Sequence, residues 1–253
     1  MPLAHPPTRA LLERFTRLGE EADSELAMAL AISHLISGGD AARCPGIDEL
    51  VRRCGEASAH RLSARLRDAG FHPQLTNQPG LVHSDLHEVA RTAIGIPITL
   101  SLIGLVVGRA FGCEARGVNY PGYFLVEVDG ELLDPATFDV IPDEHQPSSP
   151  LPYASARDIG LRMLNNVKQI YARDGAIDTC LQLVDCQLAM VHGQRHMQAA
   201  LYFEQGEYWQ SIAGFDGARR AYLQCAELAD DEELRGKALQ RLEALQGRNQ
   251  TLH

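Results

Sequence analysis

Helical periodicity dominates the first third of the chain. Apolar residues recur at three- and four-residue steps from Ala10 to Ile36, the period of amphipathic helices. Ser-Gly-Gly-Asp at residues 37–40 ends that run, and residues 46–66 predict one or two further helices. Ser84 and Asp85 can cap a short helix that runs through Ala90. The pattern therefore predicts a helical N-terminal part.

After Gly95 the chain becomes apolar on nearly all sides. The run PITLSLIGLVV starts with Pro97, where the first turn of a helix tolerates proline, and it predicts a buried central helix that ends near residues 111–112. Glycines recur on it at four-residue steps, at Gly104, Gly108 and Gly112. They indicate close packing of this helix against a neighbouring element.

Strand patterns follow the central helix. Residues 114–119 and 123–128 are strand-like, Asp129-Gly130 is a favoured two-residue hairpin turn, and residues 131–133 return antiparallel. One central helix against a small sheet predicts the α+β fold class, and the fold expected is a helix-and-sheet domain followed by an all-helical domain.

Proline and serine mark the predicted domain boundary. We place a linker at residues 142–155, between a first domain at 1–141 and an all-helical domain at 156–253, because this segment is rich in both residues: Pro142, Pro147, Ser148, Ser149, Pro150 and Pro152.

Two segments of the second domain are similar to each other. Their glycines, Gly175 and Gly206, lie 31 residues apart, and each segment resembles a tetratricopeptide helix-turn-helix unit of about 34 residues. The alignment predicts a corner at Gly206 and a second helix interrupted by Gly214 and Gly217. With a closing helix at residues 231–245, this half forms either a helical buttress for the first domain or a peptide-binding groove.

Composition narrows the function classes. The chain has 253 residues, 45% hydrophobic and 22% charged, and a formal net charge of -10, which opposes binding to nucleic acid and to anionic membranes. We expect a cytoplasmic protein, because the N-terminus has no signal-peptide pattern and the longest apolar run, residues 94–107, is too short to span a bilayer. The six cysteines show no CxxC spacing, which favours reduced thiols.

Four sequence pieces resemble the SirB1 family, whose members combine a transglutaminase-like domain with tetratricopeptide-like helices. In chain order they are GIPITLSLIGLVVGRAFG, GVNYPGYFLVE, LLDP and LRMLNNVKQIY. The resemblance implies a papain-like fold, in which a Cys at the start of the central helix attacks an acyl group. A His on the following strand and an Asp after the next turn complete that triad.

The resemblance implies that only a remnant of the triad is present here. Residues 96–98 contain no Cys, as is general among SirB1-like proteins, and Tyr123 stands where the family commonly has His. A phenol with a pKa of about 10 cannot act as a base at neutral pH as imidazole does. Asp134 occupies the third position, and a turn that ends a strand is a sufficient role for it.

Substitute catalytic groups find little support in the sequence. Thr99 and Ser101 lie in the first turns of the central helix without a nearby His in sequence, and Cys113 lies at the far end of that helix. We expect Cys44 and Cys54 at exposed loop positions, but exposure alone does not activate a thiol. Two histidine pairs have the four-residue spacing of zinc helices: His83 with His87, and His192 with His196. Neither pair has a clear third ligand, so we expect no metal and no cofactor.

Two functions remain open. The first is a non-catalytic interaction or scaffold protein that binds a protein or peptide partner in a cleft formed by Asn119, Tyr120, Tyr123 and Asp134, together with Arg162, Asn165 and Asn166. The alternative is a hydrolase or acyltransferase that uses a non-standard residue or a metal. A role in a bacterial regulatory pathway is a third possibility, in which the net charge argues against DNA contact.

Overall fold

The computed structural model describes residues 2–54, 59–75, 78–120, 123–142, 144, 146 and 151–250, with side chains at all of these except 54, 59, 60, 123 and 247–250. Its contacts divide the chain into two compact units, which we describe separately. A sheet-bearing unit comprises Leu3–Pro6 and Leu18–Ile170, and a helical unit comprises Met1–Pro2, Pro7–Arg17 and Tyr171–His253.

This division differs from the predicted domain boundary at residues 142–155. Most of helix α1 (Arg9–Glu20) belongs with the C-terminal helices, where the Thr16 hydroxyl donates to the carbonyl oxygen of Ala189 (3.0 Å). Helix α7 (Ala156–Arg173) belongs mainly with the sheet. Both assignments depend on contacts between residues far apart in the chain, which local composition does not report.

The other predicted N-terminal helices are present in the sheet-bearing unit. They are α2 (Glu25–Ser37), α3 (Pro45–Cys54), α4 (Ala59–Asp68) and α5 (Leu86–Thr92), with a short 3-10 helix, η1 (Leu81–His83), between the last two. Asp85 caps α5 as predicted, because its side chain accepts from the backbone N–H of His87 (3.0 Å). A parallel pair, β1 (His72–Pro73) and β2 (Ile94–Gly95), was not predicted, since two residues are too few for a strand pattern.

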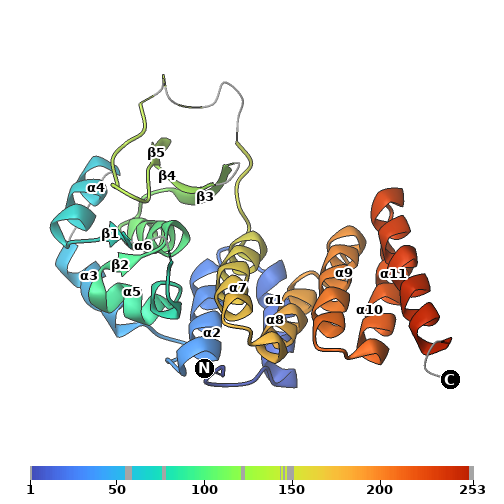
Figure 1. The fold of residues 1–253 in the computed structure, drawn as a ribbon. Helices are drawn as coiled ribbons and strands as arrows, with labels where there is room; N and C mark the ends of the chain where they lie inside the picture. The colour runs from blue at the N-terminus through green and yellow to red at the C-terminus, as the bar shows by residue number, and fades with distance from the viewer. Residues whose placement is uncertain are drawn as a thin grey trace. The chain divides into compact units, whose positions relative to one another are not determined.

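Helix α6 (Pro97–Ala110) is the buried central helix, and its prediction is confirmed. The sheet packs on it (Figure 1) and has the order β3 (Ala115–Tyr120), β4 (Tyr123–Val128) and β5 (Glu131–Leu133), with antiparallel neighbours. The turn between β4 and β5 has positive φ at both Asp129 (51°) and Gly130 (84°), as the favoured hairpin turn requires.

Two of the three glycines predicted to permit close packing do so. A Cβ at Gly104 would lie 3.4 Å from Cγ1 of Val126, and one at Gly108 would lie 3.3 Å from Cβ of Ala115, so both glycines face the sheet. Gly112 lies beyond the end of α6, with a φ of 80°, and it serves the turn into β3.

In the helical unit, α8 (Ile177–Met190) packs on α9 (Arg195–Ser211), which packs on α10 (Phe215–Leu228), and α10 packs on α11 (Glu232–Gln250), as Figure 1 shows for this unit. The corner predicted at Gly206 is wrong, because α9 continues through it. A Cβ at this position would lie 2.5 Å from Cε1 of Tyr222, so the glycine permits a close helix crossing.

The interruption predicted at Gly217 is also wrong. Gly217 lies inside α10, and a Cβ there would lie 2.6 Å from Cδ2 of Trp209, so the absence of a side chain makes room for the indole. Gly214 precedes the helix at its N-cap position. Among the described helices of both units, none has a stretch that is long and apolar enough to cross a bilayer.

Candidate functional site

A pocket of about 330 Å³ lies at the start of α6, entirely within the sheet-bearing unit. Three elements form it: the first turn of α6, the first part of β4 and one face of α7. Its lining residues are Pro97, Ile98, Phe124, Arg162, Asn165, Asn166 and Gln169.

The N-terminus of α6 brings partial positive charge to this pocket. Ile96 is the N-cap residue, with an extended backbone (φ -94°, ψ 162°), and it has no side-chain oxygen to accept from the N–H groups of Ile98 and Thr99. Pro97 occupies the first helical position, where a missing N–H costs nothing. The helix start therefore offers backbone donors and the positive end of the helix dipole.

Phe124 forms the sheet side of the pocket. Its side chain is 2% exposed and lies over Gly117, where a Cβ would come within 2.6 Å of the ring. The absence of a side chain at Gly117 thus makes room for the end of the Phe124 ring against β3. Since Ile98 contributes the neighbouring apolar surface, the pocket combines an apolar wall with polar groups.

Helix α7 contributes a polar stripe to the pocket. Arg162, Asn165, Asn166 and Gln169 have the spacing i, i+3, i+4 and i+7, which places them on one face of a helix. The start of α7 is held by a capping box, in which the N–H of Ser155 donates to the Asp158 carboxylate (2.9 Å) and the N–H of Asp158 donates to the Ser155 hydroxyl (3.2 Å).

Three of the predicted cleft residues line this pocket, namely Arg162, Asn165 and Asn166. Among the described residues, Asn119 and Tyr120 do not belong to its lining. The Asn119 Nδ2 donates to Asp158 (3.5 Å), and its Oδ1 is buried without a hydrogen-bond partner. Tyr120 packs with a separate apolar cluster of Val118, Leu125 and Leu132.

Asp134 serves a turn after β5. Its carboxylate accepts from the N–H of Ala136 (2.7 Å), and its backbone N–H donates to the carbonyl oxygen of Asp139 (2.9 Å). The first of these bonds is that of an Asx-type turn, and the second closes the loop after β5, so Asp134 has the simpler of the two roles considered for it. Tyr123 begins β4, and its side chain lies outside the described residues.

The hydroxyl groups at the start of α6 are engaged with the backbone. Thr99 is fully buried, and its Oγ1 lies 2.9 Å from the carbonyl oxygen of His83 and 3.0 Å from that of Ile96. Ser101 is also fully buried and donates to the carbonyl oxygen of Phe124 (3.1 Å). Both side chains therefore stabilise local structure, and neither presents a nucleophile to the pocket.

Burial makes the described thiols poor nucleophiles. Cys44, expected in an exposed loop, is instead buried beside the start of α3, and burial raises its pKa. Burial also raises the pKa of Cys113 and Cys186, and that of Cys225 to about 11. Because the thiolate is the reactive form, these groups are protonated and unreactive at neutral pH. The side chain of Cys54 lies outside the described residues.

The histidine pairs do not share a helix face. His83 ends η1, and its Nδ1 accepts from the N–H of Gly80 (3.0 Å), whereas His87 lies in α5 with its Nε2 3.0 Å from the carbonyl oxygen of Asp40. His192 precedes α9, which holds His196. In the described part of the chain, no three His, Cys, Asp or Glu side chains form a group that could hold a metal ion.

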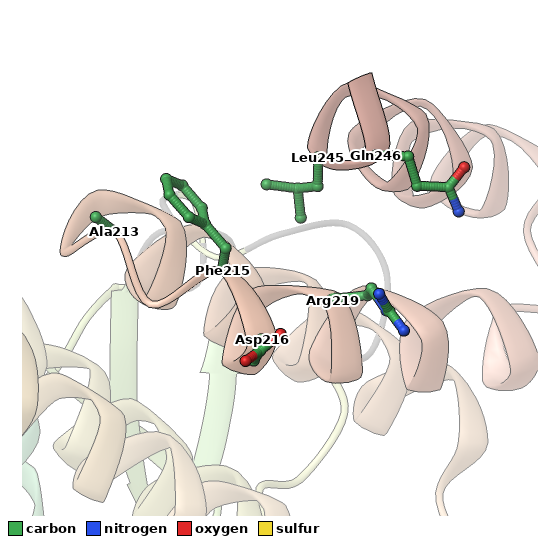
Figure 2. A pocket seen from close by; sticks show the side chains of 6 residues that line it. All are labelled: Ala213, Phe215, Asp216, Arg219, Leu245 and Gln246. Atoms are coloured by element: carbon green, nitrogen blue, oxygen red, sulfur yellow. The ribbon is translucent and has the colours of Figure 1, made fainter. Parts of the chain in front are cut away.

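A second pocket, of about 240 Å³, lies between α10 and α11 in the helical unit. Figure 2 shows Phe215 and Leu245 extending from the two helices beside it, with Asp216 and Arg219 along α10. Because Asp216 and Arg219 carry opposite charges, this pocket has no evident preference for a charged ligand. The pocket at α6 has one cationic side chain and no acidic one among its described lining residues.

The pocket at α6 lies in a recognisable superfamily fold. Residues 46–146 match the family described as transglutaminase-like superfamily. This part of the chain is a transglutaminase-like domain. It holds the start of α6 and β4, whereas the polar stripe of α7 comes from the segment that follows it.

Known proteins with similar sequences come from bacteria and animals. A UPF0162 protein of Pseudomonas aeruginosa is 28% identical over 60% of this chain and 65% of its own length, and one of Xylella fastidiosa (strain 9a5c) is 28% identical over 44% and 48%. The human F-box only protein 21 is 28% identical over 48% of this chain and 24% of its own length. The alignments thus span less than two thirds of these relatives. No solved structure gave a significant match.

Proposed function

We propose that this chain is a non-catalytic protein-interaction protein that binds a peptide or partner side chain in the pocket at the start of α6. The observation that carries the proposal is the composition of this pocket. Ile96, Pro97 and Ile98 occupy the helix start where the thiol enzymes of this superfamily place their nucleophile, while polar side chains of α7 face the same space.

The surrounding chemistry supports binding over catalysis. Thr99 and Ser101 are bonded to backbone carbonyls, the described thiols are buried, and Asp134 holds a turn. A pocket with an apolar wall and a few oriented polar groups is typical of a ligand site. The match to one quarter of a longer F-box only protein also fits a domain that serves as a module within larger proteins.

A selection of random peptides on the immobilised full chain tests the proposal. Selected peptides should lose at least about tenfold in affinity with Asn165→Trp, because indole fills the pocket at an exposed position of α7. Gln240→Trp, at an exposed position of α11, is the matched control and should leave the affinity unchanged. Peptides that bind equally to both variants would place the interaction elsewhere.

The enzymatic alternative is tested on the same preparation. Incubation with an acylated glutamine substrate and hydroxylamine should yield no hydroxamate above the protein-free blank. Turnover that disappears in Tyr123→Ala, or near-stoichiometric zinc that disappears in His83→Ala, would overturn the non-catalytic proposal.

A further inference from the structure

We propose that a groove between α9 and α10 binds a Pro-x-x-Pro segment of a partner protein in the polyproline II conformation. The groove lies entirely within the helical unit and has a volume of about 210 Å³. It is separate from the pocket at the start of α6 that carries the proposed function. Its lining residues are Tyr202, Gln205 and Trp209 of α9 and Gly217, Arg220, Ala221 and Gln224 of α10.

Two aromatic side chains form the α9 wall of this groove. Tyr202 and Trp209 are half-buried, and they are seven residues apart, which is about 10.5 Å at a rise of about 1.5 Å per residue. A polyproline II helix has three residues per turn and rises about 3.1 Å per residue, so prolines at i and i+3 lie on one face about 9.3 Å apart. The spacing of the two rings therefore matches that of the two prolines.

The indole of Trp209 lies against the start of α10. A Cβ at Gly214 would lie 2.6 Å from Cε3 of the indole, and a Cβ at Gly217 would lie 2.6 Å from its Cδ2. Because the ring is held against the backbone at both glycines, it loses little further freedom when a ligand binds. Such a rigid aromatic surface suits a proline-rich segment, which is already extended and also has little conformational entropy to lose.

The groove also offers hydrogen-bond donors. Within the described part of the chain, no hydrogen bond or ion pair engages the Tyr202 hydroxyl, the Trp209 indole N–H or the Arg220 guanidinium. A polyproline II segment has no internal hydrogen bonds, so its carbonyl oxygens need donors from outside. Indole and guanidinium groups are donors only, and they can supply these bonds.

The charges around the groove favour a neutral ligand. Both lining amides are engaged with carboxylates, since Nε2 of Gln205 donates to Asp185 (2.9 Å). Likewise, Nε2 of Gln224 donates to Glu227 (3.2 Å). Arg220 is an exposed cation on the same groove. Because charges of both signs surround it, neither an acidic nor a basic side chain gains a clear electrostatic advantage, whereas proline rings and backbone carbonyls do not depend on one.

The fluorescence of Trp209 provides the test, because it is the single tryptophan of the chain and lines the groove. Two capped peptides without aromatic residues are titrated into the full chain. One is acetyl-Gly-Ala-Pro-Ala-Ala-Pro-Ala-Gly-amide, and the other has three alanines between its prolines. The first should shift the emission and bind at least about fivefold more tightly, because the extra residue turns the second proline to another face of the peptide.

Arg220→Ala should weaken binding of the first peptide about fivefold, because a hydrogen bond to a charged donor is lost. Arg219→Ala, at the adjacent arginine of α10 outside this lining, is the matched control and should leave the affinity unchanged. Both side chains are exposed, so we expect both variants to fold.

The chain has a Pro-Ser-Ser-Pro sequence of its own at residues 147–150, which lie outside the described residues. The double variant Pro147→Ala/Pro150→Ala is therefore titrated in parallel. Tighter peptide binding by this variant would support the groove and identify the chain's own segment as a competing occupant.

Equal affinity for the two peptides would overturn this inference, as would absence of binding to both the unmodified chain and the double variant. An effect of Arg220→Ala no larger than that of Arg219→Ala would also overturn it. None of these results bears on the proposed function, which is tested separately by Asn165→Trp at the pocket of α6.

Discussion

Helices α6 and α9 both carry glycines at close contacts, yet they solve different packing problems. Helix α6 is buried on nearly all sides, and an added Cβ at Gly104 or Gly108 would lie 3.3 Å or more from the nearest atom of the sheet. Helix α9 is fully buried only at Ala199 and Gly206, and an added Cβ at Gly206 would meet Tyr222 at 2.5 Å. Because α6 is buried around most of its surface, many contacts share its stabilisation. Helix α9 is more exposed, so it depends more on its close crossing with α10 at Gly206.

The largest expected effect concerns the ion pair that anchors the end of α6. Arg109 donates to both carboxylate oxygens of Glu25 (2.8 and 3.1 Å), whose side chain is 6% exposed. Arg109→Met leaves that charge buried without its partner and should lower the free energy of unfolding by about 3 kcal/mol. Urea unfolding, with hydrogen exchange in α2 and α6, measures the loss.

Arg43→Met is the control for this pair, since Arg43 and its partner Asp48 are largely exposed. It should cost less than about 1 kcal/mol. Equal losses in the two variants would contradict the role assigned to burial at Glu25.

The next largest effect is expected from a substitution that disrupts the close crossing of α9 and α10. Gly206→Ala should destabilise the helical unit by about 2 kcal/mol, because the overpacking cost against Tyr222 exceeds the gain of about 1 kcal/mol in helix propensity. Gly236→Ala in α11 meets nothing within 4 Å and should stabilise by about 0.5 to 1 kcal/mol. Unfolding curves of the two variants should therefore shift in opposite directions, and a shared direction would contradict the crossing.

Alkaline pH provides a second test of the crossing between α9 and α10, through the titration of Tyr222. Burial raises the pKa of Tyr222 to about 12, from an ordinary value of 10. The fold therefore favours the neutral phenol, whose stabilisation is complete below pH 10 and is lost as the pH rises toward 12. By pH 11 this loss amounts to about 1 kcal/mol.

Tyr222→Phe should remove this share of the alkaline loss when stability is measured between pH 8 and pH 11. Tyr153→Phe, at an exposed ring, serves as the control and should keep the original pH dependence. If Tyr222→Phe lost stability between pH 8 and pH 11 as steeply as the unmodified chain does, the pKa assigned to this phenol would be wrong.

The smallest effect distinguishes the two glycines of α6. Gly104→Ala meets Val126 at 3.4 Å, an ordinary contact, and should be neutral or stabilising by up to about 1 kcal/mol. Gly108→Ala meets Leu62 at 3.2 Å and Ala115 at 3.3 Å, so it should be less stable than Gly104→Ala by about 1 kcal/mol. Thermal unfolding of the pair gives the ranking, and the reverse order would refute this account of the sheet contact.

Local sequence patterns were sufficient to predict an element where the pattern is compatible with only one structure. The apolar run after Pro97 predicted α6, and Asp129-Gly130 predicted the hairpin between β4 and β5. At Gly206 and Gly217 the same reasoning failed, because a glycine can mark either a corner or a close helix contact. Only the positions of Tyr222 and Trp209 distinguish the two.

The candidate site shows the same limit. Arg162, Asn165 and Asn166 were proposed from sequence, but Phe124 and Gln169 were not, although the i, i+3, i+4 and i+7 spacing along α7 was a usable signal. Nothing local linked that stripe to the start of α6, more than 60 residues earlier in the chain, because the contact arises from packing across the sheet-bearing unit.

The sequence by itself determined the helix-and-sheet class, the buried central helix, the hairpin and the absence of a Cys from residues 96–98, because each follows from local residue type and spacing. The tertiary structure alone decided that Asp134 holds a turn, that the described thiols are buried, and that the α7 stripe faces the start of α6. Burial and side-chain partners depend on residues distant in the chain, and they decide which polar groups remain available to a ligand.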